Sequence, residues 1–596
     1  MMDNRNIILA VALSIAILVG FEMYFSSKRP VPPKDGQSQS QQAQPQKGAT
    51  QPSSPQASTT PSAQPSIPQA TTASGVPTVP GVPTAALAAT RKAILKQGPR
   101  IRISTPSLHG SIDLMGGRID DLTLAGHRET LDKNSDEIVL LIPKGDKKAY
   151  FADFGWVSAD GQAVPGADTL WKADGKALSH ETPVTLSWDN GQGLKFTRTY
   201  SVDNKYMFTV SQKVENTGKK AATLFPYGLI SRRTTPEVSG FYIIHEGLLG
   251  VANSTLKEID YEDIKEQGQV KEASKGGWLG ITDKYWMAAL VPDQSAQVNA
   301  RYTYRKDSGD DLFQVDYLSA AVTVTPGSSS GAENRLFAGA KEVATMDAYN
   351  ETLGIDRFDL TIDFGWFYFL TKPIFYALLY INGVVMNFGL SIILLTIFIK
   401  LVFFPLANKS YTSMSRMKKL APQMTTLRER FADDKQRLNQ EMMELYKREK
   451  VNPASGCLPI LIQIPVFFAL YKVLFVNIEM RHAPFFGWIK DLSAADPTTI
   501  FNLFGLIPWT PPEFLMIGVW PLIMGVSMFL QQKLNPQPTD PMQAKIFLFL
   551  PIMFTFLLAR FPAGLVIYWA VNNILSMAQQ WLIMKRMGIS GKDALK

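Results

Sequence analysis

The chain has 596 residues, too many for a single hydrophobic core, so two or more domains are expected. Apolar residues make up 46% of it and charged residues 19%, but the polar residues crowd before residue 360 and the long apolar runs follow it. The formal net charge is +8, yet the basic residues cluster beside apolar runs, where they set membrane orientation, so nucleic-acid binding is not expected. Cys457 is the only cysteine, which excludes internal disulfides and a cysteine-ligated metal.

The N-terminal segment predicts a membrane anchor. Residues 7–21 are almost wholly apolar and are flanked by basic residues. A cleaved signal peptide would end in small residues, whereas Glu22 and bulky side chains follow here, which favours an uncleaved anchor. We therefore expect a cytoplasmic N-terminus at 1–5 and a transmembrane anchor at 6–26.

The next two segments predict a tether and a β domain. Residues 27–95 are dominated by Pro, Gln, Ser, Thr, Ala and Gly, which cannot bury enough apolar surface to offset the entropy of ordering, so a disordered linker is expected. Residues 96–355 contain short alternating runs such as Phe196-Thr-Arg-Thr-Tyr200, separated by Gly, Asp and Asn turns. This pattern predicts a large antiparallel β-sandwich.

The C-terminal part alternates apolar runs with polar loops. An aromatic, amphiphilic run at 364–385 predicts a helix lying in the membrane interface. Five later runs are long enough, or nearly so, to cross the hydrocarbon, which with the anchor predicts a polytopic α-helical membrane protein of six transmembrane helices. Helices 2 to 6 are predicted at 389–406, 457–478, 513–532, 545–561 and 563–584. Their connections are a cytoplasmic helical hairpin at 407–456, a periplasmic loop at 479–512, a cytoplasmic loop at 533–544 and a cytoplasmic tail at 585–596.

The loops predict the orientation. The segment between predicted helices 2 and 3 carries eleven Lys and Arg residues against six Asp and Glu residues, whereas the next loop together with Glu513 carries two against four. Cytoplasmic loops carry the excess of Lys and Arg, so both termini are expected inside a bacterial inner membrane and the β domain outside it, in the periplasm.

Polar residues inside the predicted spans indicate a candidate site. Lys400 lies within helix 2 with Thr396 one turn away, three polar residues share one face of the last helix, and helix 3 adds another. Snorkelling of Lys400 and ordinary helix–helix hydrogen bonds are the alternative to a shared polar cavity. Because a cation accompanies the set, we favour the shared polar cavity. Its candidate residues are Lys400, Thr396, Gln463, Tyr568, Asn572 and Ser576.

Two further features bear on mechanism. No membrane-embedded carboxylate accompanies Lys400, which argues against an ion-coupled mechanism, and Lys472 near the outer end of helix 3 is expected to snorkel. In the cytoplasmic hairpin, Met417, Met424 and Met442 would suit a surface that receives varied apolar segments, with a purely structural hairpin as the alternative.

Enzyme motifs are missing from the sequence. There is no P-loop, no G-x-S-x-G and no H-E-x-x-H, and the five histidines show no metal-ligand spacing. Neither catalysis nor a cofactor or metal is therefore expected.

Five short stretches of the C-terminal part are distinctive: Lys450-Val-Asn-Pro-Ala-Ser-Gly-Cys-Leu-Pro459, Leu461-Ile-Gln-Ile-Pro465, Ala469-Leu-Tyr471, Asp540-Pro-Met-Gln543 and Pro562-Ala-Gly-Leu-Val-Ile-Tyr568. Together they resemble the YidC membrane-protein insertases of Gram-negative bacteria. The resemblance covers the anchor, the exported domain and all five later spans. It implies that these five spans form a groove open to cytoplasm and lipid, closed to the outside, and carrying one cation.

The resemblance also implies an exit path and partners. Nascent spans would slide into lipid along helices 3 and 5, with candidate contacts at Ile464, Phe467 and Trp569. Lys400 stands where arginine is usual, which keeps the charge and loses the bidentate fork, and Trp569 stands where tyrosine is frequent. An additional stretch at 501–512 lengthens the second outside loop. Implied partners are nascent membrane proteins, the Sec translocon, the ribosome, the signal-recognition-particle receptor and membrane lipids.

The predicted function is therefore a membrane protein insertase and chaperone, acting alone or with the Sec translocon. The alternative is a solute or lipid transporter with an exported carbohydrate-binding-like domain. Transporters commonly contain paired repeats, and no internal repeat is visible in this sequence, which favours the insertase.

Overall fold

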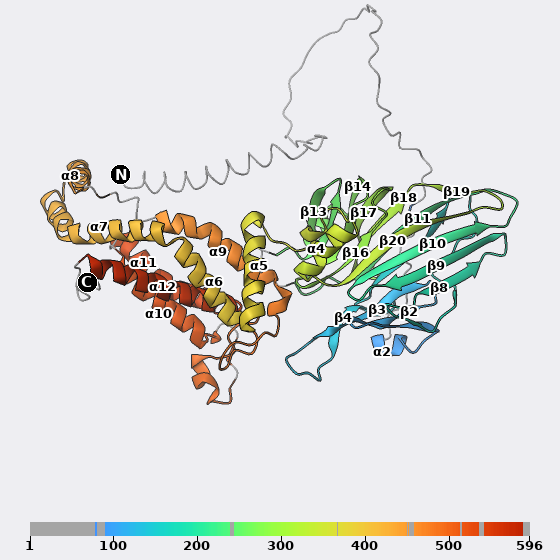
Figure 1. Cartoon of the computed structure of the whole chain (residues 1–596), viewed down its shortest axis with the longest axis horizontal. Helices are drawn as coiled ribbons and strands as arrows, with labels where there is room; N and C mark the ends of the chain where they lie inside the picture. The colour runs from blue at the N-terminus through green and yellow to red at the C-terminus, as the bar shows by residue number, and fades with distance from the viewer. Residues whose placement is uncertain are drawn as a thin grey trace, which may run out of the picture. The chain divides into compact units, whose positions relative to one another are not determined.

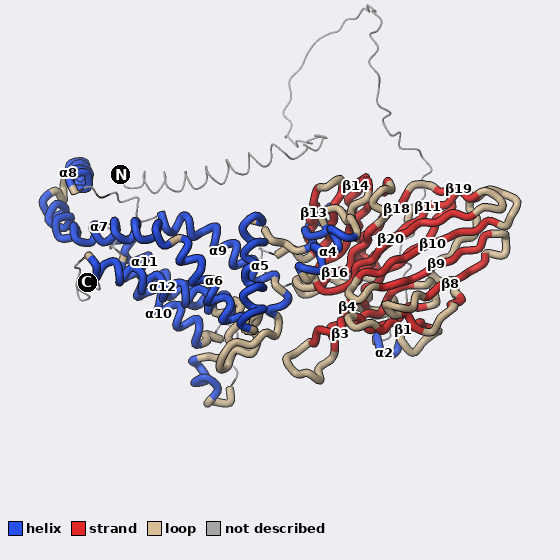
Figure 2. The backbone as a smooth tube through the Cα atoms, in the orientation of Figure 1, coloured by secondary structure: helices blue, strands red, loops and turns tan. Residues whose placement is uncertain are grey.

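The computed structural model describes residues 78–79, 90–238, 244–365, 367–449, 451, 458–509, 511–512, 515–535 and 541–587. Over these residues the chain forms a β-sandwich followed by a helical region (Figure 1, Figure 2). The predicted N-terminus and anchor, 1–26, lie outside the described residues, as does most of the predicted linker.

The described parts of the linker are ordered, so the prediction of disorder over 27–95 is wrong for them. Arg91–Ile94 form the short helix α2, and Arg91 pairs with Asp121 at 2.5 Å. Val79 is buried against an apolar patch on the sandwich that includes Phe151 and Leu229, and its carbonyl accepts from Arg301 at 3.3 Å. Arg91 and Val79 thus contact residues that are far away in the sequence, and the composition of the linker does not reveal such contacts.

Two sheets make the sandwich, which confirms the predicted fold class of the exported domain. The first sheet has the order β14-β17-β18-β11-β5-β3-β2-β1-β7, with β19 on β11 and β4 on β3; the second has the order β13-β12-β15-β16-β20-β10-β9-β8-β6. Neighbouring strands are antiparallel, except that β1 and β7 pair in parallel. The strands of the first sheet are β1 (Arg100–Ser104), β2 (Leu108–Asp113), β3 (Arg118–Arg128), β4 (Glu137–Leu141), β5 (Tyr150–Ser158), β7 (Ala177–Leu178), β11 (Ala222–Arg233), β14 (Gln269–Lys275), β17 (Gln297–Asp307), β18 (Asp310–Ser319) and β19 (Val322–Val324). Those of the second are β6 (Lys172–Ala173), β8 (Val184–Asp189), β9 (Leu194–Val202), β10 (Met207–Asn216), β12 (Gly247–Ala252), β13 (Thr255–Asp260), β15 (Trp278–Thr282), β16 (Trp286–Val291) and β20 (Ser329–Ala340).

Alternating burial builds the core of the sandwich. Along β9, every second residue from Leu194 to Val202 is buried while those between are not, as expected for a strand with one face toward the core. Aromatic side chains from both sheets fill the core, among them Trp156, Phe196 and Phe313. Two helices accompany the strands: α3 (Tyr261–Gln267) and α4 (Val343–Thr352).

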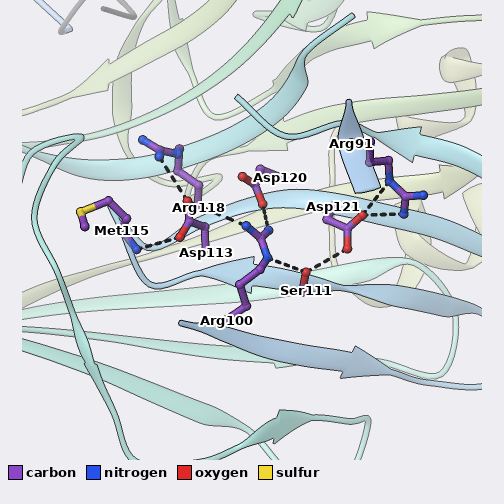
Figure 3. Close-up of polar contacts among 8 residues, drawn as sticks. All are labelled: Arg91, Arg100, Ser111, Asp113, Met115, Arg118, Asp120 and Asp121. Carbon is purple, nitrogen blue, oxygen red and sulfur yellow. Dashed lines mark hydrogen bonds and ion pairs between the residues drawn. The ribbon is translucent and has the colours of Figure 1, made fainter. Parts of the chain in front are cut away.

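Buried charges in the first sheet are paired (Figure 3). Arg100 of β1 pairs with Asp120 of β3 and donates to Ser111 at 2.8 Å, and Ser111 donates to Asp121 at 2.8 Å. Burial raises the pKa of Asp120 to about 7, although the neighbouring Arg100 opposes this rise. Desolvation therefore outweighs the attraction of the ion pair at this carboxylate.

The helical region begins after the 3-10 turn η1 (Phe358–Thr361). Its helices are α5 (Tyr368–Val385), α6 (Phe388–Val402), α7 (Phe404–Arg430), α8 (Lys435–Arg448), α9 (Leu458–Val476), α10 (Val519–Leu534), α11 (Pro541–Leu558) and α12 (Ala563–Arg586). Two 3-10 turns, η3 (Ile478–Met480) and η4 (Ile500–Gly505), lie between α9 and α10.

The predicted span 389–406 is not one straight helix. The backbone bends by 70° between α6 and α7. Pro405 lies in the first turn of α7, where its missing N–H costs nothing, but its ring would clash with a continuous helix through Phe403. The apolar run continues across this break, so hydropathy alone did not reveal it.

Few of the described helices are, by themselves, long and apolar enough to cross a membrane. α5 is long and apolar enough to span by itself, and α6 with the first part of α7 would be a second if the bent pair counts as one span. The apolar parts of α9 and α11 are shorter. This criterion does not reproduce the predicted six spans, and α5 occupies the segment predicted to lie in the interface.

The segment predicted as a cytoplasmic hairpin contains two helices, α7 and α8. Asp434 caps α8, because its side chain accepts from the backbone N–H of Arg437 at 3.0 Å. Pro422 lies inside α7. The hairpin base is fixed to the ends of two other helices: the ammonium of Lys418 donates to the carbonyl of Lys533 at 3.3 Å, and that of Lys419 to Met587 at 2.8 Å.

Candidate functional site

A cavity of about 50 Å³ lies among α6, α7, α9 and α12. Five of the six predicted groove residues line it, and the sixth, Ser576, accepts a hydrogen bond from Lys400. The five are Thr396, Lys400, Gln463, Tyr568 and Asn572. At roughly 10–15 Å³ for each water, the space would hold about three to five molecules. The structure thus brings together side chains that are up to 180 residues apart in the sequence.

Hydrogen bonds among neutral groups hold the cation in this cavity. The ammonium of Lys400 donates to the Ser576 hydroxyl at 2.7 Å, and that hydroxyl donates to the Asn572 carbonyl at 2.8 Å. The Gln463 amide donates to the Asn572 side chain at 2.8 Å. Among the described residues that line the cavity none is a carboxylate, so the partners of Lys400 there are dipoles.

The sequence pattern missed seven lining residues. They are Ile399, Phe403, Leu406, Ala407, Tyr411, Val466 and Leu470. On α6 and α7 they follow Thr396 and Lys400 at steps of three or four, and on α9 two of them follow Gln463 in the same way. Extending the polar positions along one helical face would have found them, although six are aliphatic or aromatic hydrocarbon side chains typical of any core.

The start of α12 packs closely against the connection between α9 and α10. Gly564 of α12 lies so near its neighbours that a Cβ there would be 2.9 Å from Met480 and 3.4 Å from Ile392. The backbone N–H of Gly564 donates to the carbonyl of Leu492 in this connection at 2.9 Å. A larger residue at this position would have to push that loop away.

Other polar residues of the last helix fix α12 to α10. The Asn573 amide donates to the Ser527 hydroxyl at 3.2 Å, and the Gln580 amide donates to the carbonyl of Leu534 at 3.1 Å. For these side chains, ordinary helix–helix hydrogen bonding accounts for the polar pattern.

The three candidate exit contacts lie near the cavity. Phe467 of α9 and Trp569 of α12 stack with their ring centroids 5.0 Å apart and their planes 10° apart. Ile464 is exposed on α9, and Phe468 nearby is exposed too. An apolar surface therefore continues from the cavity wall onto the outside of the helices.

The predicted hairpin methionines lie partly buried. Met417, Met424 and Met442 are each half-buried, and the Tyr446 hydroxyl contacts the sulfur of Met424 at 3.9 Å. The neighbouring Met443, which the sequence pattern did not single out, is exposed.

Lys472 has a carboxylate partner that the sequence did not predict, and its snorkelling stays a prediction. Its ammonium donates to Asp363 at 2.6 Å, and both residues line a cavity of about 900 Å³ formed by α9, the start of α5 and the base of the β-sandwich. Asp363 comes from the connection that leads from the sandwich into α5, so only the tertiary fold places a carboxylate beside this lysine.

Comparison with known proteins accounts for nearly the whole chain. Residues 100–377 match the family model described as the YidC periplasmic domain, and residues 380–590 match the one described as 60Kd inner membrane protein. The membrane protein insertase YidC of Methylobacterium sp. (strain 4-46) is 51% identical over 98% of this chain and 96% of its own length. That of Bradyrhizobium diazoefficiens is 50% identical over 99% of this chain and 97% of its own.

Solved structures show weaker similarity. A crystal structure of an active YidC insertase with its first transmembrane domain resolved covers 81% of this chain and 92% of its own, with a TM-score of 0.35 and 17% identity. A galactose mutarotase-like protein from Lactobacillus casei covers 40% of this chain and 99% of its own, with a TM-score of 0.29 and 11% identity. Neither superposition by itself establishes a shared fold. Sequence identity over the full length does establish kinship, and the chain belongs to the family of YidC membrane protein insertases.

Proposed function

We propose that this chain inserts nascent membrane proteins into the bacterial inner membrane and that the Lys400 cavity receives their polar flanks. One observation carries the proposal: a cation within an apolar helical region bonds to the neutral Ser576, in a cavity whose lining combines amide and hydroxyl groups with hydrocarbon side chains. The insertase family is not an enzyme family, and the lining offers dipoles and charge rather than a nucleophile with its base.

The topology proposed for the chain follows its charges. We infer six membrane spans, counting the anchor at 6–26, with both termini and the α7–α8 hairpin in the cytoplasm and the β-sandwich in the periplasm. The excess of basic residues in the hairpin supports this orientation. The packing around Gly564 is consistent with it, because a groove closed at that end can admit a segment from the cytoplasm without opening a path across the membrane.

Electrostatics explains how the cavity would lower the barrier to insertion. An acidic side chain at the bilayer centre costs about 2.5–3.5 kcal/mol on insertion scales. A carboxylate about 4 Å from an ammonium gains roughly 4 kcal/mol at an effective dielectric constant of about 20. The gain and the cost are similar, so one cation can make the passage of an acidic flank nearly neutral without holding the flank there.

Apolar parts of a substrate would take a different route. We infer that they leave the cavity past Phe467 and Trp569 and along the exposed face of α9 that carries Ile464, then enter lipid. The hairpin, with Met443 exposed and Met417, Met424 and Met442 partly buried between helices, would first meet the chain in the cytoplasm. The Sec translocon, the ribosome and the signal-recognition-particle receptor are the proposed partners for delivery.

Site-specific crosslinking to stalled nascent chains tests this function. A photoreactive phenylalanine analogue at Val466, which lines the cavity, should crosslink to the transmembrane segment of a ribosome-bound substrate. The same analogue at Leu530, exposed on α10, is the matched control and should give much less product. Equal yields at both positions, or none at Val466, would contradict a substrate path through the cavity, and a transporter would give no such products at either position.

A further inference from the structure

The connection between α9 and α10 carries an exposed cluster of apolar side chains that the proposed substrate path does not include. We call it the apolar tip, and its members are Phe501, Leu503, Phe504, Leu506, Ile507 and Trp509. Leu506 is 83% exposed, and each of the others is more than a third exposed. In Figure 2 the short helix of this connection and the turn after it project away from the other helices. Contiguous exposed apolar surface of this kind marks an interaction site.

Polar residues at the base of the loop give the tip a fixed shape. Asp496, almost fully buried, accepts from Thr498 at 2.6 Å, from the Trp488 indole at 3.1 Å and from the backbone of Trp520 at 2.9 Å. Thr499, fully buried, donates to the carbonyl of Leu515 at 2.9 Å. The loop is thus anchored on both sides by hydrogen bonds, while its apolar side chains take no part in the core.

The backbone of the tip is held in an unusual conformation. Leu503 and Phe504 have φ angles of 49° and 58°, the left-handed region that bulky residues rarely adopt. The backbone N–H of Phe504 donates to the carbonyl of Thr499 at 2.8 Å, and that of Ile507 to Asn502 at 3.0 Å. These bonds hold the backbone so that the large side chains point outward and not back onto the helices. Such an exposed apolar arrangement is unfavourable in water.

The chemistry of the tip fits lipid better than a protein partner. The sixteen residues from 497 to 512 carry no charge, and Asn502 directs its amide to the carbonyl of Trp509 within the loop. Protein interfaces surround an apolar centre with a polar, hydrogen-bonding rim, whereas the membrane interface favours Trp and apolar side chains without directional partners. The loop also joins the outside ends of two helices proposed to span the membrane.

We propose that the apolar tip inserts into the outer leaflet of the inner membrane and anchors the outside end of the α9–α10 pair. This inference rests on the proposed topology, which places the loop on the periplasmic side. An anchor there would hold α9, which forms one wall of the cavity, at a constant depth while substrates pass along it.

Spin labels on the full-length chain in lipid vesicles test the proposal. In a Cys457→Ser background the chain has no other cysteine, so Leu506→Cys can be labelled alone. Vesicles of phosphatidylethanolamine and phosphatidylglycerol contain no partner protein. Oxygen concentrates in hydrocarbon and a nickel chelate stays in water, so their relative collision rates with the label report depth. Leu170→Cys, on an exposed loop of the β-sandwich, is the matched control, and Leu394→Cys on the exposed face of α6 is the reference for lipid.

We expect the label at Leu506 to collide several-fold more often with oxygen than with the nickel chelate, as at Leu394, and the label at Leu170 to show the reverse. A label at Leu506 that behaves like the one at Leu170 overturns the proposal and leaves the tip for a protein partner. Substrate insertion is measured in the same vesicles. A lipid-buried label with no insertion by the unlabelled parent would count against the proposed function and not against the anchor.

Discussion

The buried arginines of the β-sandwich and the lysine of the Lys400 cavity have different kinds of partner. In the sandwich, Arg198 lies 3.7 Å from Asp153, and Arg301 bonds Asp316 at 3.1 Å. In the cavity, the ammonium of Lys400 bonds the Ser576 hydroxyl, and the described lining offers it no carboxylate. A charge that already has a counterion stabilises one structure and leaves little to gain from a ligand. A cation held by dipoles can exchange them for the carboxylate of a passing segment.

The largest effect should come from unpairing a charge in the sandwich. Arg198 is 2% exposed and donates to the carbonyl of Gly117 at 2.9 Å and to that of Phe154. Arg198→Met would remove a donor from both carbonyls and the nearest cation from Asp153, although the Tyr200 hydroxyl still donates to Gly117. We expect this to lower the free energy of unfolding by about 3–5 kcal/mol. Arg102→Met, on an exposed position of β1, is the control. Thermal unfolding followed by β-sheet circular dichroism measures both, and equal melting temperatures would show that the pair does not stabilise the sandwich.

The pH dependence of the sandwich should show the cost of burying a paired carboxylate. Burial raises the pKa of Asp120 from 3.8 to about 7, so the folded state holds this proton more tightly than the unfolded state does. Stability from this group is then fully present below about pH 4 and is lost as the pH rises to about 7, by at most about 4 kcal/mol.

Substituting the neutral isostere isolates that contribution. The free energy of unfolding of Asp120→Asn should fall less between pH 4 and 7 than that of the parent. Asp121→Asn, at the neighbouring position, serves as the control. Unfolding of the full chain in detergent at several pH values provides the measurement. An unchanged pH profile in Asp120→Asn would mean that Arg100 keeps the carboxylate ionised throughout.

In the cavity, charge should alter rate more than stability. We expect Lys400→Ala to slow insertion of a single-span substrate with an acidic exported tail by about tenfold, which corresponds to ~1.4 kcal/mol in the barrier. The same substrate with a neutralised tail should be slowed much less. Lys400→Arg keeps the cation and should retain activity, although its planar fork does not reproduce the single bond to Ser576.

Comparing both tails in all three proteins, at equal protein levels, decides the role of this lysine. Equal slowing of both tails by Lys400→Ala would mean that the lysine hydrates the cavity instead of attracting acidic flanks. If neither tail is slowed, the cation has no part in insertion.

Sequence reasoning recovered the sandwich and the polar face of the cavity for the same reason. Alternation in a strand such as β9 and the four-residue spacing from Tyr568 to Ser576 both follow from local geometry, so they are visible without a structure. It missed what depends on contacts between distant residues. The bend at Phe403 depends on Pro405 inside an unbroken apolar run, and the partner of Lys472 is Asp363, from a segment 109 residues away.

The smallest effect should follow removal of the sandwich itself, because every residue that lines the Lys400 cavity lies between 396 and 572. A variant lacking 96–340 keeps α4, whose Asp347 bonds Lys372 of α5 at 2.7 Å, and keeps Asp363 beside Lys472. It loses the contact between the ammonium of Lys284 and the ring of Phe475 on α9, which lie 4.4 Å apart. Lys284→Ala in the full chain removes this contact alone and is the control. We expect insertion within about twofold of the parent, or ~0.4 kcal/mol. A much larger loss, in a variant whose helices still fold and whose Val466 analogue still crosslinks to substrate, would place part of the insertion mechanism in the sandwich.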